Sequence, residues 1–232
     1  MIKDNLREVE ERIQSACERV ERNRRDVTLI AVSKTKPISM IEEVMKEGII
    51  DFGENKVQEL NQKCEEIKTE LNWHLIGHLQ RNKVKYIIDK VSLIHSVDSL
   101  RLAIQIDEEA KKVNRIVPVL IEVNVAKEET KYGVAVEDTL SLIEEISKLN
   151  YIKIKGLMTI APYVENPEEN REHFRNLRKL SVDIKSKNID NVDMDILSMG
   201  MTNDYQVAIE EGATMVRVGT GIFGEREYNK GE

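Results

Sequence analysis

Eight short runs of aliphatic and β-branched residues alternate along the chain with longer runs that are charged and amphipathic. Each short run has the length of a typical β-strand, and several are rich in Val and Ile. The predicted strands cover residues 28–33, 49–53, 73–77, 92–97, 117–125, 152–158, 194–199 and 214–219. This alternation constrains the fold more than any other feature of the sequence.

The longer runs have the three- and four-residue apolar spacing of helices that pack by one face. In the first of them, Leu6, Val9, Ile13 and Val20 follow this spacing. The predicted helices cover residues 3–23, 38–47, 55–71, 80–90, 98–114, 135–149, 167–188 and 203–212.

Four residues mark expected helix boundaries. Pro37 suits the first turn of a helix, and Asp98 suits an N-cap. Gly48 and Gly212 stand where helices are expected to end.

Strands that alternate with helices form parallel sheets with right-handed crossovers. Eight such units in 232 residues predict a closed (β/α)8 barrel of the TIM type, with residues 1–232 as a single domain. An open doubly wound sheet is the alternative. The loop over residues 159–170 holds two of the four prolines, and it is either a lid over a site or a solvated connection.

Composition excludes several classes of protein. Hydrophobic residues make up 41% of the chain, which is enough for a core, and the net charge of −7 disfavours general binding to nucleic acid. Two cysteines are too few for a disulfide scaffold and predict reduced thiols. No run approaches the about 18 apolar residues of a membrane span, and the N-terminus is too charged for a signal peptide. The sequence therefore predicts a cytoplasmic protein that binds neither membrane nor nucleic acid.

A barrel of this type carries its active site at the C-terminal ends of its strands, and the first strand runs into Lys34. A lysine at that mouth can be shielded from solvent. Desolvation lowers the pKa of its ammonium and frees a neutral amine for Schiff-base formation. Lys36 shares a face with Lys34, so the pattern does not separate the two. A surface lysine that extends its amine into water is the alternative.

Two corners suited to an anion follow the last two strands. Gly219 and Thr220 offer backbone N–H groups and a hydroxyl, and Ser198 and Thr202 supply hydroxyls after the preceding strand. Arg217 lies inside an apolar run, so its charge needs a partner. Tight turns and helix caps are the structural alternatives for these residues.

The histidines do not predict a metal site. His74 and His78 lie four residues apart on a strand and its turn, with no cluster of Cys or carboxylates beside them. His78 is the better pocket candidate, because it follows the strand end, whereas His95 and His173 are expected to be structural or exposed. Asn55 is either a helix cap or a pocket residue.

A lysine, two anion corners and a buried arginine at one barrel mouth fit an aldehyde cofactor that carries a phosphate. Pyridoxal 5′-phosphate is the obvious candidate. An arginine at its pyridine nitrogen would keep that nitrogen unprotonated, which disfavours broad aminotransferase chemistry. The alternative is a cofactor-free aldolase whose corners bind a sugar phosphate.

Ordered motifs over essentially the whole chain resemble the YggS/PROSC family of pyridoxal phosphate homeostasis proteins. They are AVSKTKP (31–37), FGENKVQE (52–59), WHLIGHLQRNK (73–83), IHSVDS (94–99), KGLMTI (155–160), LSMGMTNDY (197–205) and VRVGTGIFGER (216–226).

The resemblance implies a barrel similar to the N-terminal domain of alanine racemase. It implies Lys34 as the Schiff-base lysine and Arg217 near the pyridine nitrogen. The other cofactor residues that it implies are Ser198, Thr202, Gly219 and Thr220 around the phosphate, with Asn55 and His78 lining the pocket.

The resemblance also implies a function in vitamin B6 homeostasis and in amino-acid and keto-acid balance, without robust turnover. The expected partners are pyridoxal phosphate and apo-enzymes that use it, and the expected state is a monomer, with a dimer as the alternative. Alanine racemase takes its second acid–base group from a separate domain, and the sequence ends at Glu232 soon after the last strand, so no catalytic residue is assigned. A weak racemase or lyase is the alternative function, and Tyr163 is the tyrosine to watch.

Overall fold

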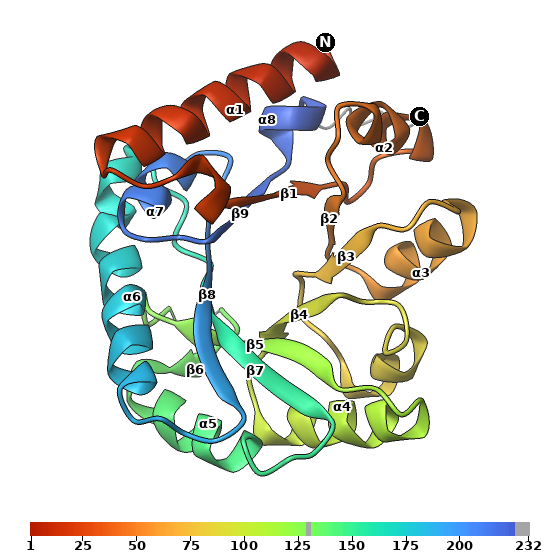
Figure 1. Cartoon of the computed structure of the whole chain (residues 1–232), viewed down its shortest axis with the longest axis vertical. Coiled ribbons are helices and arrows are strands. Elements are labelled where there is room, and N and C mark those ends of the chain that lie inside the picture. Colours follow the sequence, from red (N-terminus) through yellow and green to blue (C-terminus); the bar gives the residue numbers. More distant parts are fainter. Residues whose placement is uncertain (129–130, 226–232) are drawn as a thin grey trace.

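Eight parallel strands close into a barrel in the computed structural model of the protein, which describes residues 1–128 and 131–225 (Figure 1). The strands are β1 Thr28–Val32, β2 Asp51–Glu54, β3 Asn72–Leu75, β4 Leu93–Val97, β5 Val117–Asn124, β7 Ile152–Met158, β8 Val192–Met201 and β9 Met215–Val218. Pairing of β9 with β1 and of β4 with β5 completes the ring. The barrel prediction is confirmed, and the open sheet is wrong. Residues 226–232 of the predicted domain lie outside the described part.

One further strand was not predicted. The two residues of β6, Val134–Ala135, pair in parallel with the C-terminal end of β5. This pairing fixes the loop that follows β5 beside the barrel mouth.

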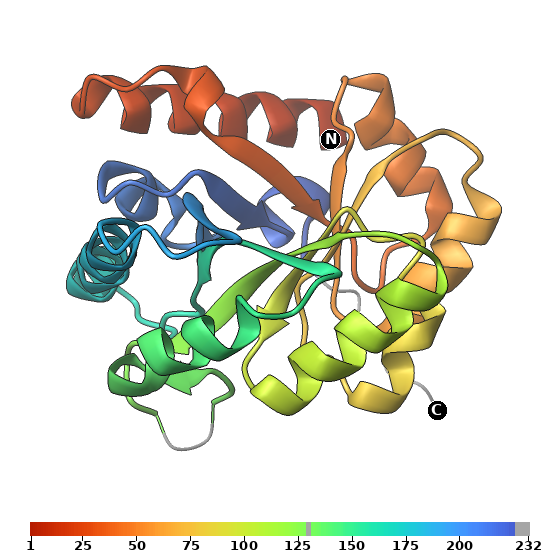
Figure 2. The ribbon, with the colours of Figure 1, turned by 60° about the horizontal axis from the view of Figure 1, so that its bottom comes forward.

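Helices surround the strands. They are α1 Ile2–Arg19, α2 Ile38–Lys46, α3 Val57–Glu66, α4 Leu100–Lys112, α5 Thr139–Ile146, α6 Arg171–Lys185, α7 Tyr205–Glu210 and α8 Thr220–Phe223. Short 3₁₀ segments are η1 Arg24–Asp26, η2 Arg81–Tyr86, η3 Val136–Asp138 and η4 Pro167–Asn170. In Figure 2 the red α1 lies along the barrel beside the blue α7 and α8, which it contacts.

Two local predictions are wrong. Residues 80–90 do not form an α-helix, because only the 3₁₀ segment η2 forms there, although Val84 and Ile87 in this range are fully buried. Ser99, rather than Asp98, is the N-cap of α4. The Asp98 carboxylate lies 3.8 Å from the ring of His78 instead. Gly48 and Gly212 follow α2 and α7 with positive φ, as their expected place at helix ends requires.

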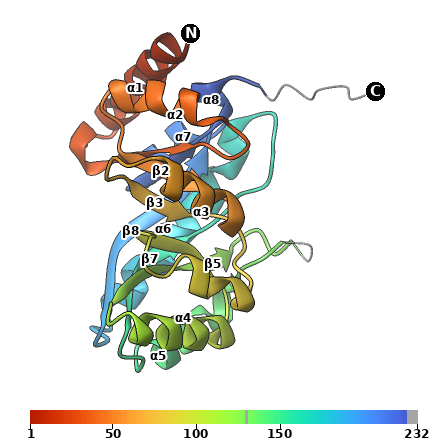
Figure 3. The same ribbon diagram turned by 90° about the vertical axis from the view of Figure 1, so that its right-hand side faces the viewer.

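The main apolar core lies between the barrel wall and the helices that surround it. Figure 3 shows several of these helices beside the strands. Inside the barrel, the apolar cluster is small: Leu93, Leu120 and Met158 pack with Ile196 and Met215. The barrel interior also holds the buried polar side chains of His74, His95, Ser198 and Arg217. The loops after β5 and β7 project from the same end of the molecule (Figure 3).

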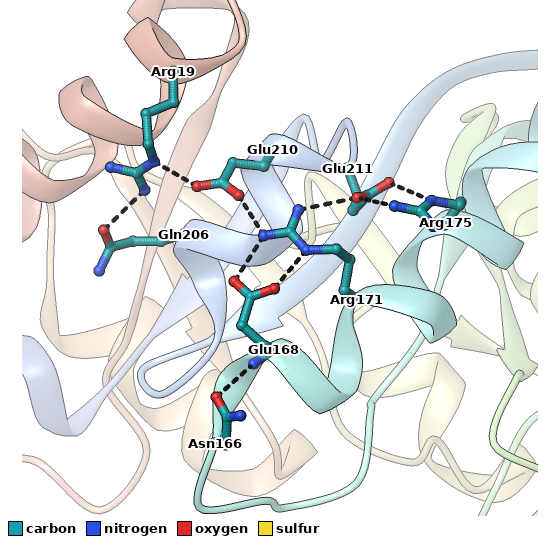
Figure 4. Close-up of polar contacts among 8 residues, drawn as sticks. All are labelled: Arg19, Asn166, Glu168, Arg171, Arg175, Gln206, Glu210 and Glu211. Atoms are coloured by element: carbon teal, nitrogen blue, oxygen red, sulfur yellow. Dashed lines mark hydrogen bonds and ion pairs between the residues drawn. The ribbon is translucent and has the colours of Figure 1, made fainter.

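A network of ion pairs joins three helices outside the barrel (Figure 4). Arg171, at the start of α6, binds Glu168, Glu210 and Glu211, and Glu210 also binds Arg19 of α1. Hydrogen bonds to Glu168 and Glu210 are the largest causes that raise the pKa of Arg171 above its usual range. Arg171 therefore ties α6 to α7, and Arg19 ties α7 to α1.

We expect Arg171→Ala to lower the free energy of unfolding by about 1–3 kcal/mol, because the partly buried carboxylates of Glu210 and Glu211 each lose one of their two arginine partners. Urea unfolding measures the change. Arg25→Ala is the control, since that side chain is exposed. An equal effect of the two substitutions would contradict the structural role of the network.

Candidate functional site

A pocket of about 650 Å³ opens at the C-terminal ends of the barrel strands. All of the predicted cofactor residues except Ser198 line it: Lys34, Asn55, His78, Thr202, Arg217, Gly219 and Thr220. The strand ends of β1, β2, β3, β8 and β9 thus bring together residues that are far apart in the sequence.

The structure separates the two lysines that the sequence pattern could not. Lys34 lines the pocket from the turn after β1. Lys36 turns to the end of α8, where its ammonium donates to the carbonyls of Phe223, Gly224 and Glu225 at 3.3 Å. Lys34 is therefore the amine that can react with a pocket ligand.

A buried ion cluster holds the turn that carries Lys34. The ammonium of Lys63 donates to the Ser33 carbonyl at 2.8 Å and to the carboxylates of Glu54 and Glu59 at 2.7 Å. The Ser33 hydroxyl also donates to Glu54 at 2.6 Å. Burial raises the pKa of Glu54, and Lys63 opposes that rise. The residue before Lys34 is thus held through both its side chain and its backbone.

A close approach of two strand ends shapes the wall beside Lys34. A Cβ at Gly77 would lie 2.4 Å from the Asn55 carbonyl, so only glycine fits there. His78 follows directly, and its ring stacks on Tyr132 with centroids 3.9 Å apart. Both rings line the pocket, so the loop after β5 contributes to its rim.

The predicted anion corner is assembled by Thr202 and the turn after β9. The Thr202 hydroxyl oxygen accepts from the backbone N–H of Gly219 at 3.2 Å and of Gly221 at 3.4 Å. The chain reaches Thr202 through Gly200, whose φ is +90° and where a Cβ would lie 2.6 Å from that of Ala208. The backbone N–H groups of Gly219 and Gly221 therefore point to the Thr202 hydroxyl, and these three groups form the corner that could hold a phosphate.

Arg217 carries a positive charge in the floor of the pocket. Its guanidinium donates to the Ser198 hydroxyl at 2.5 Å and to the Thr159 carbonyl at 2.8 Å. Burial lowers its pKa to about 10, against the opposing effects of Asp204 and Glu122. Arg217 is still protonated at neutral pH, so it acts only as a donor.

Ser198 lies beneath the pocket rather than around the expected phosphate. It is fully buried, and its hydroxyl is 2.9 Å from the ring of His95 as well as bound to Arg217. The other ring nitrogen of His95 contacts His74 at 2.9 Å, and His74 contacts Asp51 at 3.0 Å. A line of polar side chains thus runs from the pocket floor through the barrel.

Sequence reasoning missed Glu122, a pocket residue at the end of β5. Burial raises the pKa of this carboxyl to about 7, Asp98 adds to the rise, and Arg217 opposes it. A single acidic residue in the apolar run VPVLIEVNV was the signal that could have found it. The inward positions of His74 and His95 on their strands were a similar signal.

The loop over residues 159–170 borders the pocket, where Ile160 and Tyr163 line it. Asn203 donates to the Val164 carbonyl at 2.8 Å, which ties this loop to the turn after β8. Residues 1–128 and 131–225 hold no group of three or more His, Cys, Asp or Glu side chains that could bind a metal. Within the same ranges, no helix is long and apolar enough to cross a membrane.

Residues 5–227 match the family described as alanine racemase, N-terminal domain. The chain belongs to this family. It is 50% identical over 226 residues to a pyridoxal phosphate homeostasis protein of Aquifex aeolicus, covering 97% of this chain and 98% of that protein. It is 36% identical to the protein of the same name from Escherichia coli, covering 99% and 98% of the two chains.

Solved structures of family members have the same barrel. PipY of Synechococcus elongatus, with pyridoxal phosphate bound, superposes with a TM-score of 0.81 at 35% identity, over 93% of this chain and 100% of PipY. An alanine racemase of Clostridium difficile, at 18% identity, shares the fold with a TM-score of 0.75 over 98% of this chain and 57% of the racemase. The resemblance to homeostasis proteins and to the racemase barrel is confirmed.

We expect the Glu122 carboxyl to make the stability of the protein depend on pH. Because its pKa is about 7 in the folded state and lower in the unfolded state, the folded state binds more protons between about pH 4.5 and 7. Folding stability should therefore fall as pH rises through this window, by roughly 3 kcal/mol relative to Glu122→Gln.

Urea unfolding of both proteins at several pH values measures this difference. Glu172→Gln is the control, because Glu172 is exposed. Parallel stability curves for the wild type and Glu122→Gln would contradict the raised pKa.

Proposed function

We propose that this protein binds pyridoxal 5′-phosphate through Lys34 and acts in its homeostasis rather than in its catalytic use. The observation that carries the proposal is the joint position of Lys34, Arg217 and the corner of Thr202, Gly219 and Thr220 on one pocket. Each of these groups matches a different part of the cofactor.

The residues present fit the chemistry of the cofactor. An aldehyde that condenses with the Lys34 amine forms a reversible Schiff base and releases water. The hydroxyls of Thr202 and Thr220 are donors for a phosphate, and the backbone N–H groups of Gly219 and Gly221 hold the Thr202 oxygen so that its hydrogen is left for the ligand. Their grouping leaves Lys34 for the aldehyde of the ligand.

Arg217 is suited to the ring nitrogen of the cofactor. Its guanidinium uses two N–H groups for Ser198 and Thr159, which leaves further donors for a ligand above the pocket floor. A permanent donor at the nitrogen keeps it unprotonated, which weakens the ring as an electron sink. This arrangement suits holding the cofactor better than driving broad amino-acid chemistry.

The relatives support the same assignment. The names of the Aquifex aeolicus and Escherichia coli proteins refer to pyridoxal phosphate homeostasis, and PipY binds pyridoxal phosphate in its solved structure. Within this proposal, the protein is cytoplasmic and monomeric and supplies the cofactor to apo-enzymes that need it. The exposed mouth of the pocket gives the cofactor a route in and out.

We expect Lys34→Arg to lose the yellow absorption band that pyridoxal phosphate gives with the wild type. Arginine keeps the charge but does not form the Schiff base. Lys36→Arg is the matched control, because Lys36 binds the carbonyls after α8, and it should keep the band. Spectra before and after borohydride measure both.

Three outcomes would count against this assignment. A wild type that stays colourless would overturn the cofactor proposal. Trapping by borohydride only with a ketose phosphate would favour the aldolase. A band that survives in Lys34→Arg would assign the Schiff base to another lysine.

A weak racemase or lyase is the second candidate, and Glu122 is the observation that favours it. A carboxyl with a pKa of about 7 in the same pocket as Lys34 is suited to transfer protons near neutral pH. We expect the protein loaded with pyridoxal phosphate to exchange the α-proton of alanine in D2O far more slowly than an enzyme turns over. Exchange at several per second that is lost in Glu122→Gln would establish the enzyme instead.

A further inference from the structure

The line of polar side chains beneath the pocket crosses the barrel interior from one end to the other. Asp51 is the first residue of β2, at the end of the barrel opposite the pocket, and Arg217 lies at the pocket floor. His74, His95 and Ser198 connect them: the contacts from Asp51 to Ser198 are 2.9–3.0 Å, and Ser198 contacts Arg217 at 2.5 Å. These three residues are at most 2% exposed, so water does not replace their hydrogen bonds.

Asp51 sets the direction of the first two hydrogen bonds. An ionised carboxylate only accepts, so the facing nitrogen of His74, Nε2, must carry the hydrogen. At a pH at which the His74 ring carries one hydrogen, that ring has one donor and one acceptor, so Nδ1 of His74 then accepts. The hydrogen between the two rings therefore belongs to Nε2 of His95.

The same order of donors and acceptors continues from His95 to the pocket floor. Burial, with smaller effects of His74 and Arg217, lowers the pKa of His95 well below its usual range, so His95 is neutral. Its Nδ1 must accept, and its hydrogen-bond partner in the described part of the chain, the Ser198 hydroxyl, gives the hydrogen. With its hydrogen directed to His95, the Ser198 oxygen presents its lone pairs to Arg217.

The opposite direction is unfavourable at both ends. It would bring two acceptors together where His74 meets Asp51. At the other end, both His95 and Arg217 would donate to the Ser198 oxygen, so the hydrogen of the Ser198 hydroxyl would need a further buried acceptor. A buried donor without a partner is destabilising. The negative charge of Asp51 thus selects one arrangement of all four hydrogen bonds.

We propose that Asp51 is a remote positioning residue for the cofactor site, which orders the hydrogen bonds through His74, His95 and Ser198 so that Arg217 is held in the pocket floor. Asp51 itself does not touch the pocket. In this order, the Ser198 oxygen accepts from the Arg217 guanidinium, while the Ser198 hydrogen stays directed to His95. The link to cofactor binding rests on the proposed function, whereas the order of the hydrogen bonds does not.

The first test reads the histidine tautomers by ¹H–¹⁵N NMR of the full chain without cofactor, at pH 8, where an ordinary imidazole is neutral. His74→Gln and His95→Gln assign the signals. We expect both rings to carry their hydrogen on Nε2 in the wild type. A hydrogen on Nδ1 of either ring in the wild type would overturn the proposal, and this measurement needs no substitution at Asp51.

The second test replaces the charge at the far end. The amide of Asp51→Asn can donate or accept, so we expect both tautomers of His74 and His95 to appear. Asp107→Asn is the matched control. Asp107 lies on α4, outside the barrel, and its carboxylate accepts from the backbone N–H of Tyr151. Unchanged tautomers in Asp51→Asn would overturn the proposal.

The third test measures binding of pyridoxal phosphate by absorbance. We expect Asp51→Asn to weaken it roughly five- to tenfold, as the loss of one polarised hydrogen bond at Arg217 would. Asp107→Asn should stay within about twofold of the wild type. Equal affinity of Asp51→Asn and the wild type would overturn the link to the site. Failure of the wild type itself to bind would overturn the proposed function and leave the tautomer result standing.

Discussion

The buried charge of Arg217 is the constraint on which the rest of the site depends. A guanidinium at 3% exposure needs hydrogen-bond acceptors, and the barrel supplies them from β7 and β8 through Thr159 and Ser198. The polar interior follows from this need, because Ser198 in turn requires His95, and His95 requires His74. An apolar barrel core of ordinary packing could not hold this arginine.

A second buried charge cluster supports the opposite wall of the pocket. Lys63 of α3, Glu54 at the end of β2 and Ser33 just after β1 hold the turn from which Lys34 enters the pocket. The reactive amine and the arginine are thus each positioned by a separate polar network. Rigid support of this kind keeps the distance between the two ends of a bound ligand constant.

The alternation of short apolar runs with amphipathic runs predicted the barrel, because eight buried parallel strands leave a clear apolar signal in the sequence. The helix prediction failed at 80–90, where Val84 and Ile87 are buried but the backbone winds as a 3₁₀ segment. Strand-end residues such as Lys34 and Thr202 could be predicted because parallel strands share one mouth. Glu122 and the place of Ser198 could not, because burial and hydrogen-bond partners depend on how distant strands meet.

The central claim is that Lys34, rather than any other lysine, holds pyridoxal phosphate. Tandem mass spectrometry of peptides from the borohydride-reduced complex tests it most directly. The account predicts that the added pyridoxyl phosphate mass lies on the peptide containing Lys34, at Lys34 itself. The added mass on Lys36 or on another lysine, or no added mass on any peptide, would contradict it.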